Sequence, residues 1–149
     1  MNYTIKFFTI LAFIILPVIN DSKSDTIKYN DEKSLILKNF DKQIECWKDG
    51  DIDCYMTCYV VSEDVKAVTS QGIINGHKEL TTVFKQYWNA ENMGVLEFFD
   101  IKLEKLSDEY YYSNGKFKVT MPDKKIHEGY FSSIMKKVGN EWLIYKDHS

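Results

Sequence analysis

The first half of the chain has the apolar periodicity of helices. Apolar side chains recur every three or four residues between positions 30 and 49, after a polar segment (21–28) that we interpret as a linker. A second, shorter helix is expected after Asp51, whose carboxylate can cap it. A third is expected to begin at Asn75-Gly76 and to end at Met93-Gly94. The apolar stripes of the three helices are Leu37, Phe40, Ile44 and Trp47; Ile52, Tyr55, Met56 and Tyr59; and Leu80, Val83, Phe84, Tyr87 and Trp88.

The second half has the period-two pattern of strands. Short apolar segments around 65–68 and 73–74 indicate two short strands between the second and third helices. Four longer strands are expected from Val95 onward, with a bulge or bend at Asn114-Gly115 and turns at Pro122-Asp123 and Gly139-Asn140. Three helices followed by a four-stranded antiparallel meander predict an α+β fold, with the helices on one face of the sheet.

The last two strands allow a register to be predicted. A two-residue turn at Gly139-Asn140 would place Lys137 opposite Trp142 and Met135 opposite Ile144. Continued without interruption, this register places Phe131 opposite His148, with His127 farther along the same face. A shift of one residue would exchange the two faces.

Composition and charge narrow the classes of function. The chain has 149 residues, enough for one domain, and its 44% hydrophobic and 15% aromatic residues suffice for a core. Its net charge is −3, and all 19 basic residues are lysine. Without arginine or a lysine cluster, a nucleic-acid partner is not expected. The sequence has no phosphate-binding loop, dinucleotide fingerprint or metal-binding helix motif, so neither cofactor nor metal is expected.

The N-terminus resembles a secretory signal peptide. Lys6 precedes a continuous apolar segment over residues 7–19, which is shorter than the roughly 20 residues that a membrane-spanning helix needs. We expect a signal peptide over residues 1–24, cleaved after Ser24, and a mature domain over residues 25–149. An uncleaved anchor is the alternative. The protein is therefore expected to be exported, periplasmic or secreted, and to contact membranes only through this segment.

Three cysteines follow, Cys46, Cys54 and Cys58. Export permits a disulfide, but three cysteines cannot all pair within one chain. Small core residues are the other interpretation. A C-x3-C pair without further ligands is weak evidence for zinc.

Several local motifs occur in the order typical of one superfamily. They are Trp47-Lys-Asp-Gly-Asp51 followed by Tyr55 and Tyr59; Gly72-Ile-Ile-Asn-Gly76 before a helix; and Gly129, Glu141-Trp142 and Asp147-His148-Ser149 in the closing hairpin. In this order the chain resembles the SnoaL-like branch of the nuclear-transport-factor-2-like (NTF2-like) superfamily, the cone fold shared with ketosteroid isomerase, and within it an uncharacterised exported subfamily. The resemblance implies a strongly curved antiparallel sheet around the helices and a cavity open at one end. It also implies frequent homodimers through the outer sheet face, where the predicted register puts Ile134, Leu143 and Tyr145. It implies no single activity.

An isomerase of this fold needs a carboxylate aimed into an apolar cavity beside a tyrosine. Strand parity favours Glu97 over Asp100 for this role, although solvated strand-face carboxylates explain both. We expect His77 to be exposed at the start of the third helix. The candidate ligand-binding residues are Tyr55, Tyr59, Trp88, His127 and His148. The alternative for the two histidines is a purely structural role.

Three functions fit these observations. The first is an exported protein whose tyrosine-rich, apolar pocket binds a small hydrophobic ligand. The second is a cofactor-independent isomerase, cyclase or dehydratase, which a buried carboxylate within hydrogen-bonding reach of a tyrosine would favour. The third is a dimerisation module whose vestigial pocket is filled by Phe84 and Trp88.

Overall fold

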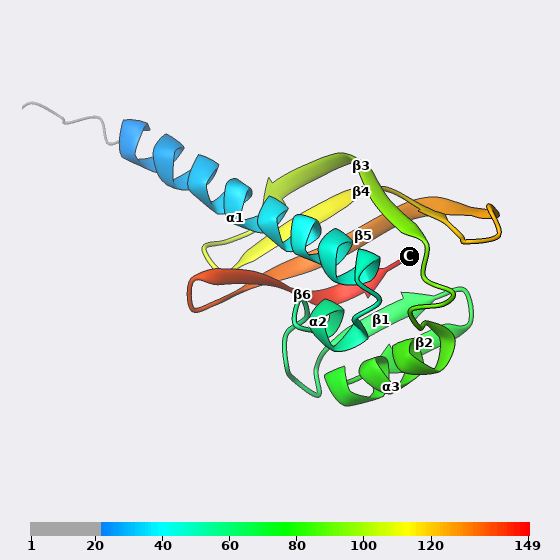
Figure 1. Cartoon of the computed structure of the whole chain (residues 1–149). Coiled ribbons are helices and arrows are strands. Elements are labelled where there is room, and N and C mark those ends of the chain that lie inside the picture. Colours follow the sequence, from blue (N-terminus) through cyan, green and yellow to red (C-terminus); the bar gives the residue numbers. More distant parts are fainter. Residues whose placement is uncertain (1–21) are drawn as a thin grey trace, which may run out of the picture.

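The computed structural model describes residues 22–149, with side chains described from Asp31 onward. These residues form three helices and six strands (Figure 1): α1 (Ser22–Lys48), α2 (Ile52–Met56), β1 (Lys66–Thr69), β2 (Gly72–Asn75), α3 (His77–Tyr87), β3 (Val95–Lys105), β4 (Tyr110–Thr120), β5 (Ile126–Val138) and β6 (Glu141–His148). Most of the expected signal peptide lies outside the described residues. Within the described part of the chain, no helix is long and apolar enough to cross a membrane.

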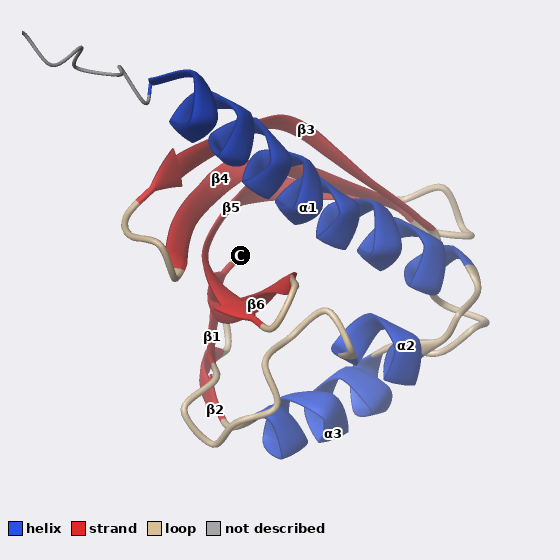
Figure 2. Ribbon diagram, turned by 90° about the vertical axis from the view of Figure 1, so that its left-hand side faces the viewer, coloured by secondary structure: helices blue, strands red, loops and turns tan. Residues whose placement is uncertain are grey.

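The strands form one sheet in the order β2-β1-β6-β5-β4-β3. The sheet curves strongly around α1, and all three helices lie on its concave side (Figure 2). The α+β fold with a curved sheet is therefore confirmed. The expectation of a purely antiparallel sheet is wrong at one pair, because β1 runs parallel to β6. Here the short β1–β2 hairpin extends the sheet at β6, which would otherwise have been its edge.

Helix α1 buries a face that differs from the predicted stripe. Phe40 and Trp47 are buried as expected, but Leu37 is 41% exposed and Ile36 is buried instead. The same face buries three polar residues, Glu32, Asn39 and Gln43. The helix also starts at Ser22, so the predicted linker over 21–28 is wrong. No glycine or proline interrupts the segment between Ser22 and Lys48, and nothing in its backbone chemistry stops the helix earlier.

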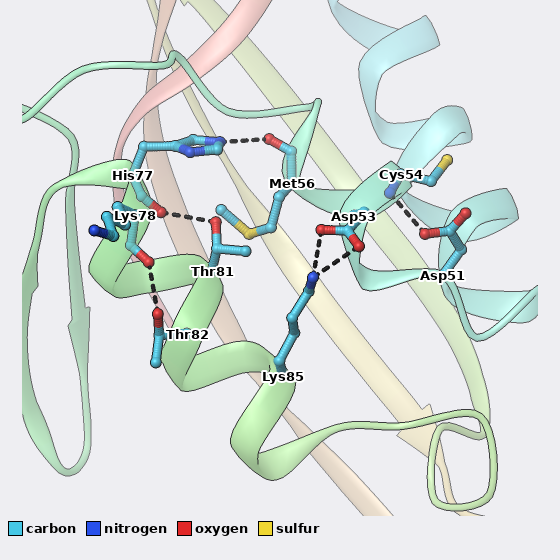
Figure 3. Close-up of polar contacts among 9 residues, drawn as sticks. All are labelled: Asp51, Asp53, Cys54, Met56, His77, Lys78, Thr81, Thr82 and Lys85. Atoms are coloured by element: carbon cyan, nitrogen blue, oxygen red, sulfur yellow. Dashed lines mark hydrogen bonds and ion pairs between the residues drawn. The ribbon is translucent and has the colours of Figure 1, made fainter.

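Polar contacts join α2 to α3 (Figure 3). Asp51 caps α2 by accepting a hydrogen bond from the backbone N–H of Cys54, as predicted. Lys85 of α3 forms an ion pair with Asp53, with 2.6 Å between Nζ and Oδ1. The Nε2 atom of His77 lies 3.0 Å from the carbonyl oxygen of Met56. His77 is therefore half-buried and tied to α2, and the expectation that it is exposed is wrong.

The predicted end of the third helix at Met93-Gly94 is also wrong. Helix α3 ends at Tyr87, and Trp88 has an extended backbone with φ −126° and ψ 132°. The side chain of Asn89 then accepts hydrogen bonds from the backbone N–H groups of Glu91 and Asn92, which stabilises a turn in place of further helix. This early end turns Trp88 toward the core, where it contacts Trp47.

Two irregularities in the sheet decide which side chains face inward. The register of β3 against β4 shifts between Phe99 and Lys102, and Asp100 has φ 54°. The irregularity thus lies on β3, opposite the position on β4 where a bulge was expected. Gly115 permits it, because a Cβ atom there would lie 2.8 Å from the carbonyl oxygen of Phe99. The second shift, in the β5–β6 pair, lies between Ile134 and Met135.

Candidate functional site

A cavity of about 870 Å³ lies between the concave face of the sheet and the helices. Residues of all three helices and of all six strands line it. The lining is mainly apolar and aromatic. Its polar residues are Gln43, Thr69, Ser70, Gln71, Gln86, His127, Glu128, Ser133, Asp147 and Ser149. The aromatic lining residues are Phe40, Trp47, Tyr55, Tyr59, Phe84, Tyr87, Trp88, Phe98, Phe117, Tyr130 and Phe131.

One wall is a continuous layer of rings from the helices and from the residues that directly follow α2 and α3. The ring centroid of Trp47, at the end of α1, lies 4.9 Å from that of Trp88 and 5.5 Å from that of Tyr55. Tyr55 in turn stacks on Phe84 at 5.5 Å and lies 6.1 Å from Tyr59. Rings packed at these distances attract one another beyond their burial, and these contacts stabilise the wall.

A carboxylate, that of Asp147 on β6, lies in the opposite wall. The hydroxyl of Tyr59 donates a hydrogen bond to Oδ2 of Asp147 at 3.1 Å, and the hydroxyl of Ser133 donates one to Oδ1 at 2.8 Å. Tyr59 and Ser133 are both buried. Asp147 itself lines the cavity and is half-buried. Both carboxylate oxygens are thus held in place by fixed donors while the group remains within reach of a ligand.

Burial shifts the protonation of this group of side chains. It raises the pKa of the Asp147 carboxyl, and the hydrogen bonds from Ser133 and Tyr59 offset the rise only in part. Burial also raises the pKa values of Tyr55 and Tyr59, and the nearby charge of Asp147 raises both further. The two tyrosines therefore remain protonated phenols at neutral pH.

A chain of buried amides fixes the orientation of Gln43 in the cavity wall. The Nδ2 atom of Asn39 donates hydrogen bonds at 3.0 Å to the carbonyl oxygens of Cys58 and Trp142. Its Oδ1 atom accepts a hydrogen bond at 2.8 Å from Nε2 of Gln43. Since only an N–H group can donate to the two carbonyls, neither amide can be flipped. The Oε1 atom of Gln43 and the second proton of its Nε2 atom are not used in this chain.

Comparison with solved structures identifies the fold. No family model matches the sequence, and neither does any curated protein sequence. An NTF2-like protein of unknown function from Shewanella oneidensis MR-1 superposes with a TM-score of 0.72 at 26% identity, over 81% of this chain and 97% of that one. The chain has the NTF2-like fold.

Two further structures agree with this assignment. A cystatin-like protein of unknown function from Nostoc punctiforme superposes with a TM-score of 0.64 at 11% identity, over 78% of this chain and 87% of that one. ActVI-ORFA from Streptomyces coelicolor superposes with a TM-score of 0.62 at 16% identity, over 78% and 93%. At such identities the likeness is one of fold, so the function of this NTF2-like domain must be argued from its own side chains.

Four of the five candidate ligand-binding residues line the cavity of the NTF2-like domain. Tyr55 and Tyr59 lie in its interior, Trp88 is half-buried in the wall, and His127 is exposed. His148 does not line this cavity. It is exposed and lines a separate, open hollow with Tyr112 and Ser132, whose side chains share the outer face of the sheet.

The β6 irregularity explains the position of His148. The first part of the predicted register is confirmed, since Lys137 pairs with Trp142 and Met135 with Ile144. Beyond the shift, however, His148 pairs with Ser132 and not with Phe131, so that part of the prediction is wrong. The extra residue on β6 exchanges the two faces of the strand beyond it. Asp147 therefore points inward, where uninterrupted pairing would have placed His148.

The two carboxylates considered from the sequence lie outside the cavity. The shift on β3 places Glu97 on the outer face with Phe99, where it forms an ion pair with Lys118 at 2.5 Å. Asp100 is exposed and forms an ion pair with Lys116 at 2.9 Å. Both are solvated strand-face residues, and the preference for Glu97 as an inward carboxylate is wrong.

The cysteines have structural positions beside the cavity. Cys46 and Cys54 form a disulfide that joins the end of α1 to α2, with 5.4 Å between their Cα atoms, and Cys58 is a buried free thiol. The bridge connects the two helices that carry Trp47 and Tyr55 and thereby helps to hold the aromatic wall. Among the described residues, no group of three or more histidine, cysteine or acidic side chains is arranged to bind a metal ion.

Proposed function

We propose that this protein binds a small, largely apolar molecule in the cavity and that Asp147 and Tyr59 bind its polar group. The observation that carries the proposal is the hydrogen-bonded carboxylate in the wall of a cavity rich in aromatic side chains. A wall of rings with a few fixed polar groups is the usual construction of a small-molecule site. Phe84 and Trp88 line the cavity and leave its volume open, which argues against a vestigial pocket.

Filling the cavity from α3 tests this proposal. We expect Val83→Phe, at a half-buried lining position, to weaken binding of the neutral fluorophore N-phenyl-1-naphthylamine at least tenfold, because the larger side chain occupies space that the probe needs. Binding is measured as the rise in probe emission. Thr82→Phe, on the exposed side of the same helix, is the matched control and should bind the probe as the wild type does. Equal affinity in both variants would show that the probe binds elsewhere.

Proton transfer is a second candidate function, because Asp147 combines a raised pKa with a neighbouring phenol. In this mechanism the carboxylate removes a proton next to a carbonyl group of the ligand, and a tyrosine hydroxyl donates a hydrogen bond to the resulting enolate oxygen. Deuterium incorporation into 2-tetralone, followed by NMR in D2O, is expected to proceed faster with the wild type than with Asp147→Asn. Equal rates in the two proteins would exclude this function for Asp147.

We also propose that the protein is exported and forms a homodimer. The apolar segment over residues 7–19 and the disulfide support export, because structural disulfides belong to oxidising compartments. The half-buried apolar side chains of Ile134, Leu143 and Tyr145 on the outer face of the sheet support a dimer interface. Sedimentation velocity of the mature domain reads the oligomeric state directly, and a monomer at all concentrations would exclude the dimer.

A further inference from the structure

The charges around the cavity are distributed unequally. None of the lysines whose side chains the structure describes lines it, and His127 is the one basic residue in this described lining. Asp147 and Glu128 are its acidic side chains. Lysines are by contrast frequent on the outer face of the sheet, where Lys136 lies over Tyr110 and Tyr145, and Lys146 lies over Tyr145. The cavity is therefore acidic although the chain offers many cations.

The aromatic wall presents rings without a cation of their own. Within the described part of the chain, no lysine lies over the rings of Trp47, Trp88 or Tyr55, which instead pack against one another. The face of an aromatic ring attracts positive charge, most strongly for tryptophan and in places shielded from water. An entering ammonium group would supply the charge that these rings lack.

The polar side chains around Asp147 present acceptors. The hydroxyl protons of Tyr59 and Ser133 are both donated to Asp147, so the two hydroxyls and the carboxylate offer lone pairs to a ligand. The amide chain likewise leaves the Oε1 atom of Gln43. An anionic ligand would meet the negative charge of this carboxylate, whereas an N–H donor carrying positive charge complements the carboxylate, both hydroxyls and Oε1 of Gln43.

We infer that the cavity selects organic ammonium ions, amines with an apolar or aromatic body, over neutral or anionic molecules of the same shape. This inference names the ligand class of the proposed binding function and therefore rests on it. The ammonium group binds at Asp147, and the body of the ligand packs against Trp47 and Trp88.

Three probes with one phenol body test the inference by calorimetry at pH 7. They are tyramine, which is a cation, 4-propylphenol, in which a methyl group replaces the ammonium, and 3-(4-hydroxyphenyl)propionate, which is an anion. We expect tyramine to bind about tenfold more tightly than 4-propylphenol, and the anion at least tenfold more weakly than 4-propylphenol, because only the cation pairs with the carboxylate. Propylphenol binding as tightly as tyramine would overturn the ammonium preference and leave the proposed cavity function intact. Absence of binding for all three probes at millimolar concentration would overturn both.

Variants assign the preference to one side chain. Asp147→Asn is expected to weaken tyramine binding about tenfold and to change 4-propylphenol binding less than twofold. Asp100→Asn removes one carboxylate from the outer face and should leave all affinities unchanged. Equal loss for both probes in Asp147→Asn, with its fold verified by circular dichroism, would overturn the role of the carboxylate. If that variant does not fold, the ranking of the three probes on the wild-type protein still decides the preference.

Discussion

Replacing Glu32 by alanine is expected to lower the free energy of unfolding by about 3 kcal/mol. Glu32 is 3% exposed, and its Oε2 atom accepts hydrogen bonds at 3.1 Å from Nζ of Lys105 and from the hydroxyl of Tyr111. The Nζ atom of Lys137 lies 3.6 Å from Oε1. These contacts tie the described start of the α1 buried face to β3, β4 and β5. This loss of unfolding free energy is at the low end of what breaking a buried ion pair costs. The reason is that the side chains of Lys105 and Lys137 are 29% and 34% exposed, so water can solvate their charges once Glu32 is removed.

The same site gives a pH dependence with a definite sign. Burial raises the pKa of Glu32, but the hydrogen bonds from Lys105 and Tyr111 and the charges of Lys105 and Lys137 outweigh it, and the pKa is lowered from 4.5. The stabilisation is therefore present above the pKa of the unfolded chain and is lost as the pH falls through the lower pKa of the folded chain. In urea denaturation, the difference in stability between wild type and Glu32→Gln should shrink from pH 6 to pH 3.

The exposed carboxylate of Glu45 on the same helix supplies the control. Glu45→Ala should change the free energy of unfolding by no more than about 0.5 kcal/mol. A difference between wild type and Glu32→Gln that stays constant over this pH range would show that shape and packing, and not the charge of Glu32, carry the stabilisation.

The fold could be predicted because periodicity identifies elements well. The change from helical spacing to alternation at Val95 marks the start of β3, and the turn at Gly139-Asn140 fixes the first pairs of the β5–β6 hairpin. The apolar stripes of the predicted second and third helices include Tyr55, Tyr59 and Trp88, and all three line the cavity because these segments pack against the concave face of the sheet.

The central side chain of the site could not be predicted, for a backbone reason. Periodicity assigns faces by counting residues, and a single irregular residue between Ile144 and Asp147 reverses the count. The irregular residue on β3 does the same for Glu97. Neither irregularity has a sequence signature of its own in the strand that carries it; Gly115 signals only that the neighbouring backbone approaches closely. An acidic residue near the end of a strand therefore has to be considered for both faces.

The buried polar face of α1 escaped prediction for a different reason. Glu32, Asn39 and Gln43 recur at helical spacing, but a pattern that scores only apolar residues assigns them to solvent. What makes their burial favourable is a set of partners that lie 73 residues away for Lys105 and 103 residues away for Trp142. Local sequence does not contain such long-range pairing.

Asn39→Leu is expected to destabilise the protein by about 3 kcal/mol, because the substitution keeps the approximate size but removes three buried hydrogen bonds. Asn39 is 6% exposed, and its amide joins α1 to the segment after α2, through the carbonyl of Cys58, and to β6, through that of Trp142. The carbonyl of Cys58 keeps a bond from the backbone N–H of Ile144, so the loss falls mainly on Trp142 and Gln43. Urea denaturation of the wild type and of Asn39→Leu under the same conditions measures this change in the free energy of unfolding.

A double-mutant cycle shows whether Asn39 and Gln43 contribute to stability as a connected pair. Gln43→Leu alone should cost about 1 to 2 kcal/mol, since it leaves only Oδ1 of Asn39 without a donor. The double variant should be more stable than the sum of the single losses predicts by at least about 0.5 kcal/mol, because the second substitution removes a group that the first has already left unpaired. Additive losses would contradict a connected chain of amides. Non-additive losses would mean that the Asn39 amide has two roles. It fastens α1 to β6 through the carbonyl of Trp142, and it holds the side chain of Gln43 in the cavity wall.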